Sequence, residues 1–169
     1  GGANLNPFSG KLDGENHQIT VPKGGLPLLG YVKEAEVRNL KIFGEEIDGY
    51  GLVNNFEGVG LSGSAIVIDH VTLVKGTKTK KAGLLGANNT NNPFAGCSAG
   101  FVATITNCTI EEGVIVGYDG NESNIGGFAG RMQGTVENCV NHGTVKGKNY
   151  VGGIVGSRDN AMGACVIKD

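Results

Sequence analysis

The sequence predicts an all-β fold, a parallel β-solenoid of roughly five irregular coils with variable loops, and we expect residues 1–169 to form a single domain. Glycine supplies 31 of the 169 residues, well above its usual share. Apolar residues lie in short, regularly spaced runs, and glycines interrupt every window long enough for a helical apolar period. The third observation is a unit that repeats along the chain and is best preserved over residues 125–156.

Two anchors recur in the same order along the chain, which argues against chance similarity. The first is an apolar stretch interrupted by one polar residue, with spacings of 31, 37 and 31 positions, and it occupies residues 37–42, 68–73, 105–110 and 136–141. The second is a glycine turn, which occupies residues 28–30, 51–53, 83–86, 127–130 and 153–156. The clearest insertions are residues 54–63 and 87–100. A solenoid tolerates such variable loops because each repeat contacts only its neighbours.

Stacking of these units would stabilise strands that are too short to bury a face alone. Each backbone would pair with the coils above and below it at about 4.8 Å. Residues 8–21 are a turn-rich entry followed by a strand, and we expect them to form the first coil. Equivalent positions then align: one aliphatic column is predicted at Val37, Ile68, Ile105 and Val136, and another column at Leu40, Val71, Cys108 and Cys139.

One corner position in each unit holds a polar residue, and these residues are Asn39, His70, Asn107 and Asn138. Asparagine tolerates the left-handed backbone that a corner needs, and its amide can bond to the amide stacked above it. We therefore predict a structural ladder in which His70 fills an asparagine slot. His17 and His142 have no partner motif and are expected at the surface.

The cysteines form no Cys-x-x-Cys pair of the kind used for zinc or redox chemistry; they are Cys97, Cys108, Cys139 and Cys165. Thiols packed as small apolar residues are the favoured interpretation. Cys108 and Cys139 would lie on adjacent coils, within the Cα separation that a disulfide accepts. A disulfide between them is therefore the alternative.

The formal net charge of −2 gives no general attraction to nucleic acid or to an anionic membrane. The one basic run, residues 75–81, is predicted to be a solvated loop. No stretch approaches the roughly 20 apolar residues of a transmembrane helix. We therefore expect no nucleic-acid partner, no membrane insertion and no cofactor.

The glycine turns and the stretches that follow them resemble the GLUG motif, a short glycine-rich repeat of large secreted or surface-attached bacterial proteins. The resemblance is carried by residues 28–30 followed by 37–40, then by residues 83–86, 126–130 and 152–156. Residues 8–19 also resemble the segment that often precedes such repeats. The second unit departs from the pattern, since Asn54 replaces the closing glycine and His70 the asparagine.

The resemblance implies a right-handed parallel β-helix outside a bacterial cell, either secreted or at the cell surface. Proteins with this motif include adhesin-like chains and the non-catalytic part of some immunoglobulin A peptidases. A non-enzymatic module is implied, serving as a stalk or spacer or as an adhesive binding surface for a host or matrix glycan or protein. We also expect the chain to continue into further domains of a longer protein.

The alternative function is that of a carbohydrate-active β-helix, a polysaccharide lyase or hydrolase with its site on an outward coil face. Asp69 and Glu137 would lie two coils apart, about 9 to 10 Å, near the upper limit for an inverting carboxylate pair. Arg38 beside Asp69 is more simply interpreted as an exposed cross-coil ion pair. We therefore rank catalysis below the non-enzymatic function.

Oxygen ligands gather in residues 118–124, where Asp119, Asn121 and Glu122 form a weak calcium candidate. Calcium needs six to eight oxygens, more than these residues supply, so a solvated turn is favoured. Three Asn-x-Ser/Thr sequons are present, and we expect the one at Asn107 to be too buried for modification; they begin at Asn88, Asn107 and Asn121.

Overall fold

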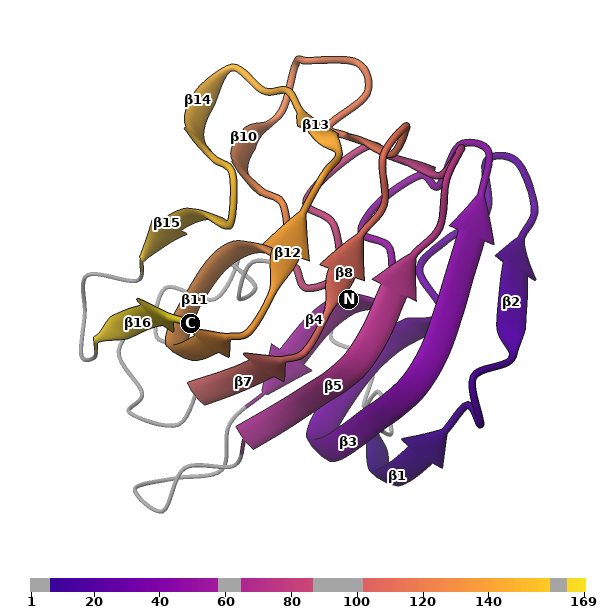
Figure 1. Cartoon of the computed structure of the whole chain (residues 1–169), viewed down its shortest axis with the longest axis vertical. Helices are drawn as coiled ribbons and strands as arrows, with labels where there is room; N and C mark the ends of the chain where they lie inside the picture. The colour runs from indigo at the N-terminus through magenta and orange to yellow at the C-terminus, as the bar shows by residue number, and fades with distance from the viewer. Residues whose placement is uncertain (1–6, 58–64, 87–101, 159–163) are drawn as a thin grey trace, which may run out of the picture.

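The computed structural model describes residues 7–57, 65–86, 102–158 and 164–169, and within these ranges it contains strands and turns but no helix (Figure 1). The strands are β1 (Phe8–Asp13), β2 (Gln18–Val21), β3 (Leu29–Gly44), β4 (Val53–Glu57), β5 (Ala65–Leu73), β6 (Lys78–Thr79), β7 (Val102–Thr106), β8 (Thr109–Ile110), β9 (Ile115–Val116), β10 (Ser123–Gly126), β11 (Ala129–Glu137), β12 (Val140–Asn141), β13 (Thr144–Val145), β14 (Asn149–Gly152), β15 (Val155–Arg158) and β16 (Cys165–Lys168).

The largest sheet runs in the order β1-β3-β5-β7-β11-β15, and its neighbouring strands point the same way (Figure 1). The short strands β2, β4, β8, β12 and β16 extend it, and two smaller sheets have the orders β6-β9-β13 and β10-β14. Each of these strand pairs is parallel. The predictions of an all-β fold and of parallel pairing are therefore confirmed.

The predicted aliphatic columns are confirmed by the strand register. Ile68 pairs with Val37 on one side and with Ile105 on the other, and Ile105 in turn pairs with Val136. All four side chains are buried. Branched aliphatic side chains pack well on a pleated surface, so the column forms a continuous core beneath the sheet.

The second column is confirmed as well, although its last residue, Cys139, is less buried than the other three. Leu40 pairs with Val71, and both are buried together with Cys108, whereas Cys139 is half-buried. Cys108, Cys139 and Cys165 are free thiols, in agreement with the favoured interpretation. Cys97 lies outside the described residues.

The corner residues take the left-handed backbone that the sequence predicts. The φ angles are 49°, 51°, 52° and 52° at Asn39, His70, Asn107 and Asn138. Each lies between two inward-facing residues of the two columns, so the turn lets the chain face the core on both sides of the corner. At the same level of each unit, one left-handed residue therefore interrupts the inward-outward alternation of side chains along the strand.

A close approach of neighbouring backbones, and not a special φ angle, explains the central glycine turns. The amide of Gly51 donates to the carbonyl oxygen of Gly83 at 2.6 Å. A Cβ atom at Gly83 would overlap the carbonyl oxygen of Gly127, and one at Gly127 would overlap that of Gly153. Only glycine fits where the turns stack this closely.

The prediction of a solvated loop over residues 75–81 is wrong for part of the run. Lys78 and Thr79 form β6, which pairs with β9. Thr77 and Thr79 are fully buried, and their hydroxyls donate to the carbonyl oxygens of Ile42 at 3.2 Å and Lys81 at 2.8 Å. Alternation of threonine with lysine turns the satisfied hydroxyls inward and leaves the charges outside.

We expect Gly83→Ala to destabilise the fold by about 3 kcal/mol, because its methyl group would overlap backbone that cannot move aside freely. Gly30→Ala is the matched control, since a Cβ atom there meets nothing within 4 Å. We expect this control to change stability by less than about 0.5 kcal/mol. Urea unfolding measures both effects, and equal stability of the two variants would contradict the assigned close approach.

Candidate functional site

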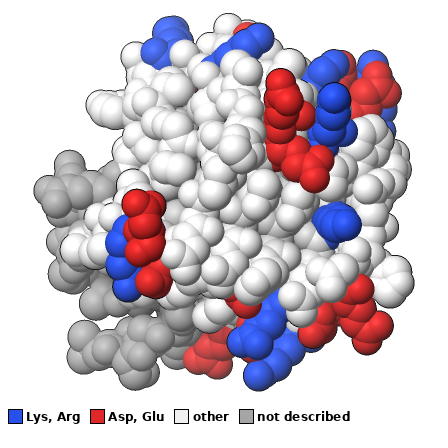
Figure 2. Space-filling model, in the orientation of Figure 1, with Lys and Arg blue, Asp and Glu red and all other residues white. Residues whose placement is uncertain are grey.

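The outward face of the largest sheet carries the two residues of the predicted catalytic pair. Arg38, Asp69, Thr106 and Glu137 share one register row across β3, β5, β7 and β11, as predicted. On the face drawn in Figure 2, acidic and basic side chains lie beside one another in small groups, and the middle of the face is mainly uncharged. The carboxylates are therefore part of a mixed polar surface.

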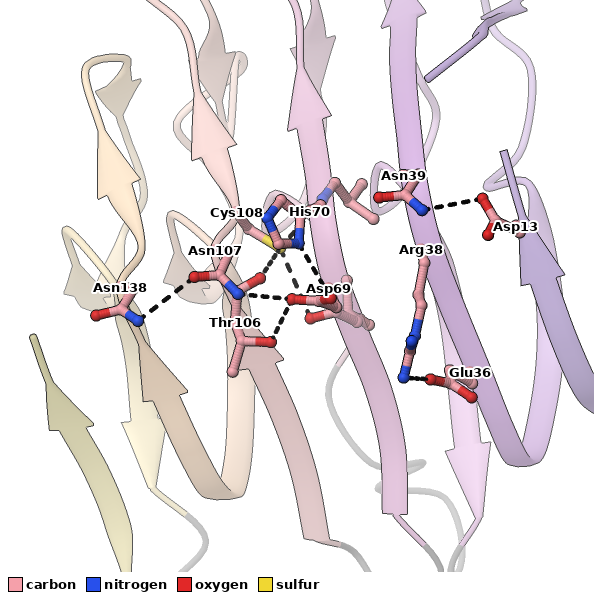
Figure 3. A network of polar contacts seen from close by, with 12 residues as sticks. Asp13, Glu36, Arg38, Asn39, Asp69, His70, Thr106, Asn107, Cys108 and Asn138 are labelled. Atoms are coloured by element: carbon pink, nitrogen blue, oxygen red, sulfur yellow. Dashed lines mark hydrogen bonds and ion pairs between the residues drawn. The ribbon is translucent and has the colours of Figure 1, made fainter. Parts of the chain in front are cut away.

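Asp69 is the centre of a polar network on this face (Figure 3). Its Oδ1 accepts hydrogen bonds from the Thr106 hydroxyl at 2.7 Å and from Asn107 Nδ2 at 2.8 Å. Its Oδ2 lies 3.0 Å from His70 Nδ1. Three groups from two neighbouring units thus hold one carboxylate in place.

These contacts decide the protonation state of Asp69. Partial burial, with 21% of the side chain exposed, raises the pKa of the carboxyl. The hydrogen bonds from Asn107, Thr106 and His70 outweigh that effect and lower the pKa to about 2. A general acid needs a raised pKa, so Asp69 is unsuited to protonate a leaving group at neutral pH.

The remaining charges of the row have other partners. Glu137 lies 3.1 Å from the Lys168 ammonium group. Arg38 contacts Glu36 on its own strand and not Asp69, so the predicted cross-coil ion pair is wrong (Figure 3). The other carboxylate oxygen of Glu36 lies 3.1 Å from the Lys11 ammonium group. The predicted catalytic residues therefore share a row without forming a site in which both carboxylates are free to react.

The corner residues form a ladder of mixed composition. The amide of Asn138 donates to Asn107 Oδ1 at 3.4 Å, as an amide ladder requires. Asn107 and Asn39 donate to carboxylates instead, the latter to Asp13 Oδ1 at 3.1 Å. His70 continues the ladder through Asp69, with 57% of its side chain exposed.

The expected burial of Asn107 on the ladder is wrong. Asn107 and Asn138 are exposed, because the left-handed corner turns their side chains to the outside while the next residue enters the core. The first residue of this sequon is therefore exposed, whereas its second residue, Cys108, is buried. The sequon at Asn121 is exposed too, and Asn88 lies outside the described residues. His17 and His142 are exposed, as expected.

The calcium candidate lies in a polar turn, and two oxygen atoms of its residues accept backbone hydrogen bonds. Asp119 Oδ1 accepts the backbone N–H of Asn121 at 3.0 Å, and the carbonyl oxygen of Glu122 accepts the N–H of Lys148 at 2.8 Å. These contacts engage oxygen atoms that a cation would use. In the described part of the chain, no group of three or more His, Cys, Asp or Glu is placed to hold a metal ion.

A different residue, missed by the sequence reasoning, presents an aromatic ring to solvent. Tyr150 in β14 is 69% exposed and has a φ angle of 53°, a left-handed conformation unusual for a bulky side chain. Val151 beside it is also exposed, and Asn149 Nδ2 donates to Ser123 Oγ at 3.3 Å. The available signal in the sequence was a tyrosine that follows Lys148-Asn149 and precedes Val151-Gly152-Gly153.

Comparison with known proteins gives no relative from which a function could be inferred: no family profile, curated protein or solved structure matches this chain. Within the described ranges, the structure contains no helix with the length and apolarity that a membrane crossing requires. The site must therefore be interpreted from its own geometry.

We expect Asp69→Asn to destabilise the protein by about 2 kcal/mol at pH 7. The folded pKa of about 2 lies below the ordinary value of 3.8, so the carboxylate stabilises the fold above about pH 4. This stabilisation is lost as the pH falls towards 2, and the difference from the wild type should shrink with it. Urea unfolding between pH 7 and pH 2.5 measures the effect.

Glu112→Gln is the matched control for that series, because Glu112 is exposed in the turn after β8. We expect it to have the same stability as the wild type across the pH range. A stability difference for Asp69→Asn that does not vary with pH would show that the carboxylate charge contributes nothing.

Proposed function

We propose that the parallel sheets are the faces of a β-solenoid, a right-handed parallel β-helix. The path of the last full unit supports this proposal. From β11 the chain passes through β12, β13 and β14, each beside its counterpart one unit earlier, and β15 then returns to pair with β11. A right-handed path is the one that about 98% of parallel crossover connections take.

On this fold we propose a non-enzymatic extracellular module, secreted or at the cell surface, that presents a binding surface for a glycan or protein. The resemblance to the GLUG motif supports the location and the class. Each unit adds about 4.8 Å along the stacking direction, so the register from Leu12 to Ile167 spans about 24 Å. A stalk or spacer role and a binding role both suit such a fold, and we propose the binding role on the basis of one exposed residue.

The exposed ring of Tyr150 is the observation that carries the binding role. The left-handed backbone of Tyr150 recurs at Asn124 one unit earlier and belongs to the repeat, so the binding role rests on the ring, which is 69% exposed. Tyrosine combines an apolar ring face with a polar hydroxyl and is enriched among the residues that dominate binding energies. At the preceding position of β14, Asn149 is hydrogen-bonded to Ser123 of β10, and both are exposed polar groups of the kind that suits a sugar or a polar peptide.

The carbohydrate-active alternative requires Asp69 and Glu137 to act on a substrate. The hydrogen bonds of Asp69 and the ion pair of Glu137 weigh against it, because both groups are already engaged. A structural role explains the hydrogen bonds of Asp69 and the ion pair of Glu137 without requiring a substrate. We therefore rank the alternative second.

We expect the chain to bind at least one member of an immobilised panel of acidic and neutral polysaccharides and matrix proteins. Tyr150→Ala should weaken that binding at least tenfold, because an aromatic anchor typically contributes 1.4 kcal/mol or more. Leu26→Ala is the matched control, since Leu26 is a similarly exposed apolar residue elsewhere on the chain. Biolayer interferometry compares the three proteins.

Either of two results would contradict the proposed binding function: no panel member binds the wild type, or Tyr150→Ala binds as well as Leu26→Ala. The same polysaccharides should show no new reducing or unsaturated ends after incubation. Product formation that Asp69→Asn abolishes would favour the carbohydrate-active alternative.

The solenoid itself predicts that one whole unit can be removed. Deleting residues 107–137 removes 31 residues and joins Thr106 to Asn138, which keeps every later side chain on its side of the sheet. We expect this variant to unfold cooperatively, because each unit contacts only its neighbours. Circular dichroism and urea unfolding provide the measurement.

Deleting residues 107–136 is the matched control, one residue shorter. It places Glu137 at the left-handed corner and Asn138 at the inward position of Cys108. A shift of one residue reverses the two faces of a strand, so this variant should lose its cooperative transition. Equal behaviour of the two deletions would contradict the solenoid.

A further inference from the structure

A pair of thiols lies at one level of neighbouring parallel strands. The register pairs Thr106–Glu137 and Thr109–Val140 flank Cys108 and Cys139, so the two cysteines are directly opposite. The backbone N–H of Cys108 donates to Cys139 Sγ at 3.4 Å. Opposite residues of neighbouring strands are about 4.8 Å apart, within the Cα range of a disulfide.

The backbone next to the pair has room to adjust. Aligned parallel strands hold their Cβ atoms slightly further apart than a disulfide prefers. Cys108 falls between the end of β7 and the start of β8, and Cys139 falls between β11 and β12. The regular ladder is interrupted there by the left-handed corners at Asn107 and Asn138, where a small rotation can bring the sulfur atoms together.

The two thiols differ in access and acidity. Cys108 is 1% exposed, and its contact with Cys139, together with burial, raises the pKa of its thiol. Cys139 is half-buried, and the same contact lowers the pKa of its thiol. The accessible group is therefore also the better source of thiolate, the form that attacks a disulfide.

We propose that Cys108 and Cys139 are a site of covalent modification, at which a small-molecule disulfide such as oxidised glutathione converts the thiol pair into an intramolecular disulfide. This inference is independent of the binding function proposed above. It assigns Cys139 as the attacking thiol and Cys108 as the resolving thiol. The half-exposed position of one and the full burial of the other fit this order.

The exchange proceeds in two balanced steps. The Cys139 thiolate attacks one sulfur of oxidised glutathione, which forms a mixed disulfide and releases one glutathione thiolate. Cys108 then loses its proton and attacks the sulfur of Cys139, which forms the Cys108–Cys139 bond and releases the second glutathione. The two cysteines are oxidised, the glutathione disulfide is reduced to two thiols, and the two protons pass to the released thiolates.

The test incubates the full chain with oxidised glutathione and maps the linked peptides by mass spectrometry without reduction. Digestion at Phe101 and Arg131 separates Cys97, Cys108 and Cys139 into different peptides. We expect a Cys108–Cys139 link in the wild type. The variant Cys165→Ser is the matched control and should form the same link, because Cys165 lies opposite Gly134 and not opposite another cysteine. The link should raise Tm by about 5 to 10 °C, because it closes a loop of about 30 residues.

The proposed order of attack has its own readout. Cys108→Ser should retain one glutathione on Cys139, because the resolving thiol is missing. Cys139→Ser should gain no glutathione on Cys108 while the protein is folded. A wild-type chain that shows no Cys108–Cys139 link, or that keeps glutathione on Cys139, would overturn the proposal.

Discussion

The rest of the described structure depends on one left-handed residue in each unit. In a regular strand, residues three apart face opposite sides of the sheet. The positive φ angle at Asn39 removes this restriction, so that Val37 and Leu40 both enter the core. Because the same turn recurs at equivalent positions, the two apolar columns stay aligned from unit to unit. Asparagine adopts this conformation at small cost, which explains its recurrence.

The sequence predicted the columns and corners because both follow from spacing. The offset of 31 residues places Ile105 over Val136, and a polar residue between apolar ones marks the corner. The repeat spacing predicts which row of the sheet a residue occupies. It does not predict which of the neighbouring side chains that residue contacts. Arg38 therefore binds Glu36 rather than Asp69, a choice that depends on side-chain geometry. The exposure of Asn107 was missed for a related reason, since a corner residue can face either side.

The candidate site was predicted less completely than the fold. Asp69 and Glu137 share the expected row, but the sequence did not indicate that Asn107, Thr106 and His70 would hold one of them. These hydrogen bonds form because the corner residues His70 and Asn107 lie next to Asp69 in the folded structure, which the repeat spacing alone does not predict. Tyr150 was missed because an exposed aromatic residue has no periodic signature. Its left-handed backbone is visible only in the structure.

The sequence separation between paired strands also bears on how fast the chain folds. Contacts within the largest sheet join residues 23 to 37 apart, which corresponds to a relative contact order of about 0.17. Two-state proteins of similar contact order fold in milliseconds to seconds, more slowly than helical bundles. Loops of 23 to 37 residues differ in closure entropy by less than about 0.5 kcal/mol, so chain entropy singles out no pair as the folding nucleus. The strands β3 and β5 pair buried aliphatic residues at three levels, Val37–Ile68, Leu40–Val71 and Ile42–Leu73, so we expect folding to start there.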